Sequence, residues 1–343
     1  MNITMPTPRQ DIFYLHLLRC IAAIAVIAIH VLGPFRFLYG EIPFDAWFSA
    51  VGINALSRWA VPIFMMISGA LLLSSNKPFD ARHYLKRRLG KVVIPFVAWS
   101  LIYAGISGAL ANDPQITVQA IVDAPANPTW YHLWFFYDFI PLYFVIPLLA
   151  PLLKAMNEEQ IKILLAGWLT LTCMHFLKVP SFLREPLVLF IGYLVLGWYL
   201  FNRDNRSQLP LWLGLGISAA VINLLGSYWA SDHKGAYSAL FMGYKSINTV
   251  VIGAMLFVLA QSYAERLGAA LRRIVTSIST YSLGIYLIHP LLLIPIRSAI
   301  ERDYAQFGHP AVAIPALTLL TLVVAWALTA LLARLPIVRQ LVP

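Results

Sequence analysis

Long apolar runs separated by short polar segments dominate this chain. Charges, prolines and glycines bound ten of them, and most approach the roughly 20 residues that a helix needs to cross a bilayer. We therefore predict an all-α, polytopic membrane bundle of about ten transmembrane helices, forming a single membrane-embedded domain over residues 1–343. The predicted spans are 12–33, 51–73, 92–111, 132–153, 161–177, 186–201, 211–229, 246–262, 279–297 and 311–333.

Composition supports a membrane protein and argues against soluble classes. Hydrophobic residues make up 60% of the chain and charged residues 12%, whereas soluble domains carry about 25% charged residues. The net charge of +10 would suggest nucleic acid as the partner of a soluble chain. Lys and Arg on the cytoplasmic side of a membrane protein explain it better, so we expect the lipid bilayer and no nucleic acid as a partner.

The distribution of Lys and Arg orients the predicted bundle. With the N-terminus in the cytoplasm, sixteen of these residues lie on the cytoplasmic side, including Arg9 and six between residues 77 and 91. Seven lie outside: Arg36, Lys178, Arg184, Lys234, Lys245, Arg297 and Arg302. This asymmetry predicts that both termini are cytoplasmic. The first run is too long for the core of a signal peptide and contains Arg19, so we expect a retained first span.

Ionisable residues inside predicted spans are candidates for function, because charge in hydrocarbon is costly. Arg19 and His30 are eleven residues apart, which places them on one face of a helix about 16 Å apart along its axis. An arginine suits a phosphate-bearing ligand, and a histidine suits proton transfer. The alternative is an arginine that reaches the headgroups and a histidine bonded to a neighbouring helix.

Other polar residues in the spans have both functional and structural interpretations. Arg58 is expected near the level of His30, where it could bind an acceptor or reach the outer headgroups. Asp138 could neutralise Arg58 or Arg19 as a structural ion pair. Tyr286 and His289 share a helix face beside a proline, where they could line a cavity or join two helices. His175, near a span end, fits a structural role.

A basic run precedes the third span, with Lys86, Arg87, Arg88 and Lys91 close together. It fits either a topogenic cluster or a binding site for a polyphosphate ligand from the cytoplasm. The chain has no nucleotide-binding glycine loop and no spacing typical of a metal site. We therefore expect no metal.

Five motifs in order resemble those of the acyltransferase-3 family of integral membrane proteins. They cover the Arg19–His30 pair, the block from Arg58 to Gly69, and the basic entry into span three with Ile94-Pro95-Phe96. The others are Tyr131-His-Leu-Trp-Phe-Phe136 and Tyr281-Ser-Leu-Gly-Ile-Tyr-Leu-Ile-His-Pro290. The chain is also similar to the subgroup that O-acetylates the amino sugar of enterobacterial common antigen.

The resemblance implies an O-acyltransferase in a bacterial cytoplasmic (inner) membrane. Its donor would be cytoplasmic acetyl-CoA, and its acceptor a hydroxyl of a cell-envelope glycan or lipid-linked sugar. His30 and Arg19 would be the catalytic pair, with His30 as general base or as a transiently acylated nucleophile. Arg87, Arg88 and Lys91 would contact the CoA phosphates. We expect the substrate to be held by Arg58, Ser68, Trp134, Tyr286 and His289.

The chain departs from the family pattern at two positions. His16 stands where many members have an aspartate, and Lys91 replaces the second arginine of a frequent Arg-x-x-Arg. Lysine keeps the charge but not the bidentate geometry of arginine. An alternative function is a transporter or flippase for a glycan or lipid-linked sugar, which should show inverted repeats or broken helices.

Overall fold

The computed structural model describes residues 12–179 and 185–343, and every regular element in these ranges is a helix. Arg9 and Arg184, counted above, lie outside them. The α-helices are α1 (Phe13–Val31), α2 (Phe44–Ala55), α3 (Ala60–Leu73), α4 (Ala81–Tyr84), α5 (Gly90–Ala111), α6 (Pro114–Asp123), α7 (Trp134–Ala155), α8 (Glu158–Phe176), α9 (Pro186–Phe201), α10 (Leu209–Lys234), α11 (Ile247–Tyr263), α12 (Ala269–Thr280), α13 (Ser282–Arg302) and α14 (Pro310–Leu332).

The apolar helices identify a multi-pass membrane protein. Among the described residues, eight helical segments are long and apolar enough to cross a bilayer. The apolar helix α9 is shorter, and α8, which covers the predicted span 161–177, is not among the eight. The all-helical class is therefore confirmed, while the count of about ten spans and the orientation stay predictions.

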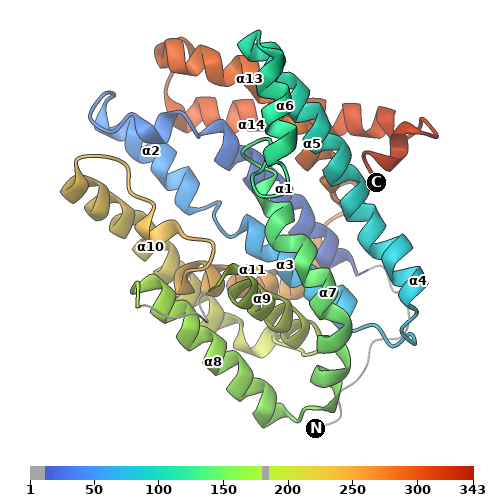
Figure 1. The fold of residues 1–343 in the computed structure, drawn as a ribbon. Helices are drawn as coiled ribbons and strands as arrows, with labels where there is room; N and C mark the ends of the chain where they lie inside the picture. The colour runs from blue at the N-terminus through green and yellow to red at the C-terminus, as the bar shows by residue number, and fades with distance from the viewer. Residues whose placement is uncertain (1–11, 180–184) are drawn as a thin grey trace.

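Helix α1 lies at the centre of the bundle. It packs against α2, α3, α11, α12, α13 and α14, and its ribbon passes between them in Figure 1. Because protein surrounds it on most sides, polar side chains on α1 face other helices instead of lipid. The bundle can therefore hold charged groups at a depth where an isolated helix could not.

Helices α3 and α9 approach each other closely enough to bring their backbones into contact. A Cβ atom on Gly69 would lie 2.0 Å from the carbonyl oxygen of Leu194, and one on Gly197 would lie 2.1 Å from that of Met66. Small residues permit such close approach in membrane bundles, where van der Waals packing replaces the hydrophobic effect as the force between helices. Each helix therefore supplies one of the two glycines that allow this contact.

The second predicted span, 51–73, is interrupted. It comprises the end of α2 and all of α3, separated by turns at residues 56–59. Pro62 explains the interruption, because proline donates no backbone hydrogen bond and its ring clashes with the carbonyl four residues earlier, here that of Arg58. The break places Arg58 on a turn, which hydropathy alone did not predict.

Two helices occupy segments that the hydrophobic pattern left as loops. Helix α6 lies in the predicted outer loop 112–131. Helix α12 lies between two predicted spans and packs against α1 through a face that includes Val275 and Ser279. Its Leu271 and Ile274 side chains are exposed, as is typical of helices at a membrane interface.

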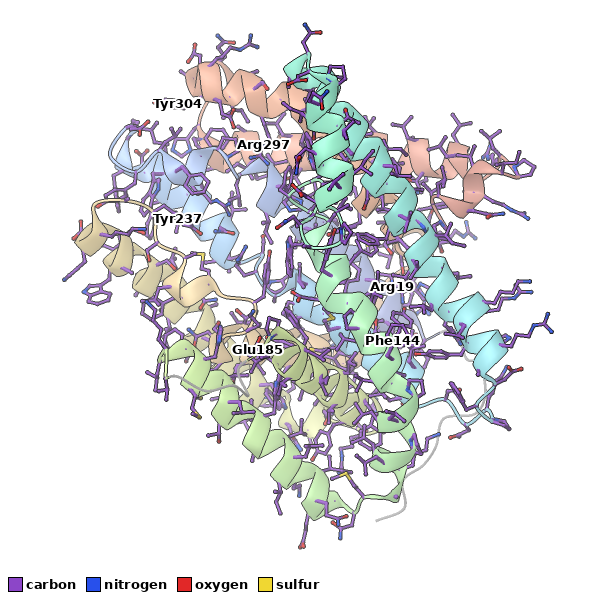
Figure 2. The ribbon with its side chains drawn as sticks, viewed as in Figure 1. Arg19, Phe144, Glu185, Tyr237, Arg297 and Tyr304 are labelled. Atoms are coloured by element: carbon purple, nitrogen blue, oxygen red, sulfur yellow. The ribbon has the colours of Figure 1, made fainter. Side chains whose placement is uncertain are left out.

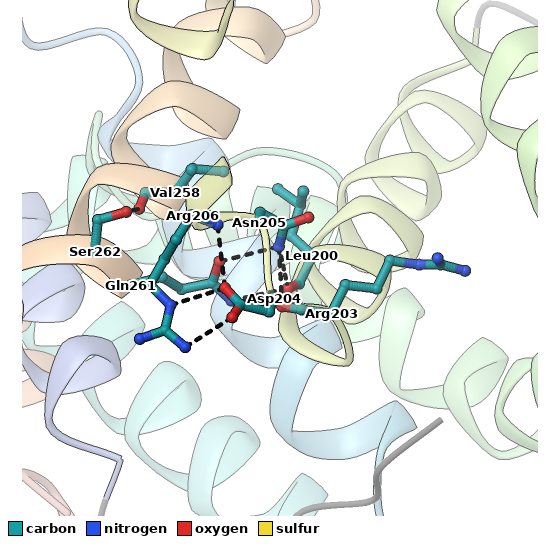
Figure 3. A network of polar contacts seen from close by, with 8 residues as sticks. All are labelled: Leu200, Arg203, Asp204, Asn205, Arg206, Val258, Gln261 and Ser262. Atoms are coloured by element: carbon teal, nitrogen blue, oxygen red, sulfur yellow. Dashed lines mark hydrogen bonds and ion pairs between the residues drawn. The ribbon is translucent and has the colours of Figure 1, made fainter. Parts of the chain in front are cut away.

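The connection between α9 and α10 is fixed by a compact polar network (Figure 3). The amide nitrogen of Asn205 donates to the carbonyl of Leu200 at 2.8 Å and to Gln261 Oε1 at 3.0 Å. The side chain and backbone N–H of Arg206 lower the pKa of Asp204 to about 2. The network thus ties this connection to the end of α11.

The close contact of α3 and α9 generates a stability prediction. We expect Gly197→Ala to lower the thermal unfolding midpoint of the detergent-purified protein, because overpacking costs about 1–3 kcal/mol or more. Gly105→Ala in α5 is the matched control, since no atom lies within 4 Å of its added Cβ. That control should be neutral or gain up to about 1 kcal/mol from helix propensity. Equal midpoints for the two variants would contradict the packing argument.

Candidate active site

Arg19 faces an internal cavity. The cavity has a volume of about 270 Å³ and adjoins side chains of α1, α3, α5, α7, α12 and α13. Phenylalanines of α7 form much of its apolar wall, and the polar groups lining it are Arg19, Ser68, Tyr143, Ser279, Thr280, Ser282 and Tyr286. Arg19 has no hydrogen-bond or ion-pair partner among the described residues. The cavity is therefore suited to a ligand that brings oxygen atoms to this guanidinium.

A wider, basic pocket adjoins this cavity. Its volume is about 560 Å³, and four cations line it: Lys86, Arg87, Lys91 and Arg339. Thr280 and Pro343 line both spaces, so the two are adjacent. Lys86 and Arg87 lie on a π-helical turn at Leu85–Leu89, a local irregularity often found at functional sites.

The structure brings only part of the expected basic run into this pocket. Arg87 and Lys91 line it, together with Arg339 from the C-terminal segment, and their contact with CoA stays a prediction. Arg88, although on the same π-helical turn, is not among the lining residues. Sequence proximity did not distinguish Arg88 from Arg87, because their directions depend on the local helix geometry.

His30 and His289 form the most direct contact between two expected site residues. The nitrogens His30 Nδ1 and His289 Nε2 are 2.7 Å apart, and the rings stack with centroids 4.9 Å apart. The pair joins α1 to α13 across 259 positions of sequence. His289, expected among the substrate-binding residues, therefore contacts the expected catalytic histidine.

The hydrogen bonds of this pair define which nitrogens carry protons. His289 Nδ1 lies 3.1 Å from the carbonyl oxygen of Ile285, and a carbonyl only accepts, so this nitrogen carries the proton. In a neutral ring, His289 Nε2 then accepts from His30 Nδ1. His30 Nε2 is left with a free lone pair, and it has no partner within the described part of the chain. His30 is thus presented as a base or nucleophile.

Aromatic residues surround the histidine pair. The ring of Tyr131 meets His30 edge-on at 5.0 Å, and the ring of Tyr286 lies 5.9 Å from that of His289. The Tyr286 hydroxyl donates to the carbonyl of His132. Since Tyr286 also lines the Arg19 cavity, it lies between that cavity and the histidine pair.

His132 is a site neighbour that the sequence interpretation did not single out. It is fully buried, its ring lies 5.9 Å from that of His289, and neither ring nitrogen has a partner among the described residues. The sequence feature that could have pointed to His132 is its position within the Tyr131–Phe136 motif. The sequence alone could not show that this motif reaches the histidine pair.

Two expected substrate-binding residues, Arg58 and Trp134, meet at Tyr244. Arg58 donates to the carbonyl of Met242 at 2.7 Å and to the Tyr244 hydroxyl at 3.0 Å, and Trp134 stacks on the Tyr244 ring at 5.3 Å. Neither lines the two spaces described above. Ser68 and Tyr286, by contrast, line the Arg19 cavity, and their binding of substrate stays a prediction.

Two further polar residues, Asp138 and His16, differ in the contacts that they make. No ion pair joins Asp138 to Arg19 or Arg58 within residues 12–179 and 185–343. The His16 Nδ1 atom lies 2.9 Å from the Ser279 hydroxyl, at the wall of the cavity. No group of three or more His, Cys, Asp or Glu suited to a metal occurs among the described residues.

The comparisons with known proteins identify the family. Residues 12–330 match the acyltransferase domain that defines the acyltransferase-3 family. No curated protein and no solved structure matches the chain. The matched segment runs from the start of α1 into the last turns of α14 and so contains Arg19, the histidine pair and three of the four cations of the basic pocket. The chain therefore belongs to the acyltransferase-3 family of membrane acyltransferases.

Proposed function

We propose that the protein transfers an acetyl group from cytoplasmic acetyl-CoA to a hydroxyl of a cell-envelope glycan or lipid-linked sugar. The observation that carries this proposal is the adjacency of three features: the basic pocket lies next to the Arg19 cavity, and Tyr286, which lines that cavity, lies beside the histidine pair. The proposal places the protein in a bacterial inner membrane with both termini cytoplasmic. The finer proposal is the subgroup that acetylates enterobacterial common antigen.

The donor would enter with its phosphates at the basic pocket. Lys86, Arg87, Lys91 and Arg339 supply the positive charge that a polyphosphate needs. The pantetheine arm would then extend through the cavity, where hydroxyls and Arg19 can donate to its oxygen atoms. The rise from Arg19 to His30, about 16 Å along α1, is comparable to the length of that arm.

His30 would carry out the proton transfer. Its Nε2 takes the proton of the acceptor hydroxyl as that oxygen attacks the thioester carbon. The tetrahedral intermediate collapses, the carbon–sulfur bond breaks, and the proton passes from Nε2 to the departing thiolate. His289 holds the His30 ring through Nδ1, so that Nε2 is the nitrogen with the lone pair. In the other route considered above, Nε2 attacks the thioester carbon, the carbon–sulfur bond breaks and CoA leaves as the thiolate. The acceptor hydroxyl then attacks the acetyl carbon on His30, the carbon–nitrogen bond breaks, and the hydroxyl proton passes to the thiolate.

One feature expected of a transporter, a broken helix, does occur in this structure, at residues 56–59. The arginine on that turn is bonded to the Met242 carbonyl and the Tyr244 hydroxyl, and the chain belongs to a family of acyltransferases. Both facts favour the enzyme. Turnover of acetyl-CoA by the purified protein separates the two functions, because only the enzyme cleaves the thioester.

Replacing His30 should abolish transfer. We expect His30→Ala to reduce acetyl transfer from radiolabelled acetyl-CoA by about 10²–10⁴-fold, the usual contribution of a general base. The matched control is His233→Ala, at an exposed position in the last turn of α10. Both variants should keep the thermal unfolding midpoint of the parent. Full activity in a folded His30→Ala protein would overturn the proposed mechanism, and an acetylated wild-type His30 trapped by acid quench would select the covalent route.

Replacing His289 tests its role in orienting His30. We expect His289→Ala to lower kcat by about tenfold or more with little change in KM for acetyl-CoA, because the His30 ring loses its acceptor. His289→Gln should recover part of the loss, since its amide oxygen can accept from His30 Nδ1. Equal kcat values for the two variants at equal unfolding midpoints would argue against this role.

The basic pocket should control donor affinity. We expect Arg87→Ala and Lys91→Ala to raise KM for acetyl-CoA several-fold, with kcat nearly unchanged, and to weaken its dependence on salt. Arg82→Ala removes the same charge from α4 outside the pocket lining, and its KM should match the parent. If all three variants had the KM of the parent, the CoA phosphates would bind elsewhere.

A further inference from the structure

Three arginines gather near the end of the bundle where His30 lies, and aromatic rings hold each of them. Arg36, just after α1, lies over Phe37 and Tyr237, with its Cζ 4.7 and 5.5 Å from the ring centroids. Arg58 lies 3.9 Å over Tyr244. Arg297 of α13 lies 4.8 Å over Tyr131. None of the three pairs with a carboxylate in the described part of the chain.

Shared neighbours connect these arginines. Tyr237, which stacks on Arg36, directs its hydroxyl at the sulfur of Met242, and the Met242 carbonyl accepts from Arg58. A terminal nitrogen of Arg297 lies 3.5 Å from the Cβ position of Gly33, three residues before Arg36. Figure 2 shows Tyr237 and Arg297 toward the α2 and α13 end of the bundle, whereas Arg19 lies toward α4. None of the three arginines lines the Arg19 cavity or the basic pocket, so the cluster is a separate site.

The arginines differ in how well their donors are satisfied. Arg58 donates to a carbonyl and a phenol. Arg36 Nε, however, is buried without an acceptor among the described residues. Burial chiefly lowers the pKa of the Arg36 guanidinium, and the charges of Arg58 and Arg297 add to the lowering. A buried donor without an acceptor, near two further cations, favours binding of an anion.

Within the described residues, no ion pair joins a carboxylate to Arg36 or Arg297. Asp232 accepts from the Tyr39 hydroxyl at 2.9 Å, and Asp45 lies 3.2 Å from His309 Nε2. Within the described residues, the positive charge of Arg36 and Arg297 is thus left for a ligand. Both side chains are partly exposed, so a ligand can reach them.

The cluster lies next to the proposed base. Arg297 is over one face of Tyr131, and the same ring meets His30 edge-on at 5.0 Å. Tyr131 is 38% exposed and His30 is partly exposed. An anion at Arg297 would consequently lie about one aromatic ring from His30, a spacing that suits another substituent of the sugar whose hydroxyl reacts.

We propose that the acetyl acceptor carries an anionic group, a carboxylate or a phosphate, and that Arg36 and Arg297 bind it beside His30. This proposal rests on the proposed function and names its acceptor class. Arginine presents paired N–H donors that match either anion. A neutral sugar would bring no charge to these two guanidinium groups and would leave the buried Arg36 Nε without an anionic acceptor, so the site discriminates against it.

The test compares matched neutral and anionic acceptors on the purified wild-type protein with radiolabelled acetyl-CoA. The pairs are glucose with glucuronate, and N-acetylglucosamine with its 1-phosphate. We expect kcat/KM for at least one anionic sugar to exceed that of its neutral partner by about tenfold or more. Arg36→Gln and Arg297→Gln should remove most of this preference, and Arg297→Lys should keep part of it. Arg302→Gln, an exposed position at the end of α13, is the control and should keep all of it.

The remaining outcomes each overturn one proposal. Wild-type protein that turns over acetyl-CoA but acetylates both members of each pair equally, or neither, overturns the anionic acceptor. So does a preference that survives both glutamine variants. If those variants instead lose only a stabilisation by phosphatidylglycerol vesicles, the arginines bind lipid headgroups and this proposal is wrong. Wild-type protein that does not turn over acetyl-CoA overturns the proposed function itself.

Discussion

An arginine on the central helix, without an acidic partner among the described residues, is the constraint on which the rest of the bundle depends. A cation inside an apolar bundle costs several kcal/mol unless polar groups or water surround it. The packing of six helices around α1 removes Arg19 from lipid, and the hydroxyl-lined cavity supplies it with a polar environment. The same cavity lies next to the basic pocket, so the groups that make Arg19 tolerable in the bundle also lie beside a cluster of cations.

The histidine pair at the other end of α1 orients His30 without a charged partner. Two neutral imidazoles and one backbone carbonyl form a chain in which each proton position fixes the next. No carboxylate takes part, so no negative charge has to be buried to orient His30. Proline at position 290, directly after His289, cannot donate a backbone hydrogen bond.

The sequence was sufficient to predict the helices, because each apolar run forms its own hydrogen bonds and the runs coincide with α1, α5, α7, α9 and the later helices. It also placed Arg19 and His30 on one face. It did not predict the break at residues 56–59 or the amphipathic helix α12, since neither depends on average hydropathy. The contact of His30 with His289, 259 positions away, and the inclusion of Arg339 in the basic pocket depend on tertiary packing. For the same reason the arginine cluster was not visible in the sequence, where Arg36 and Arg297 count as outer-side charges and Arg58 lies within a predicted span.

The backbone contact between α3 and α9 has a mechanical consequence. Helices joined at two glycines, with no side chain between their backbones, cannot slide past or separate from each other without losing contact over their whole shared length. They therefore act as a single rigid wall. The turn at residues 56–59 lies at the edge of this wall, so the break in the second span separates α2 from the rigid pair.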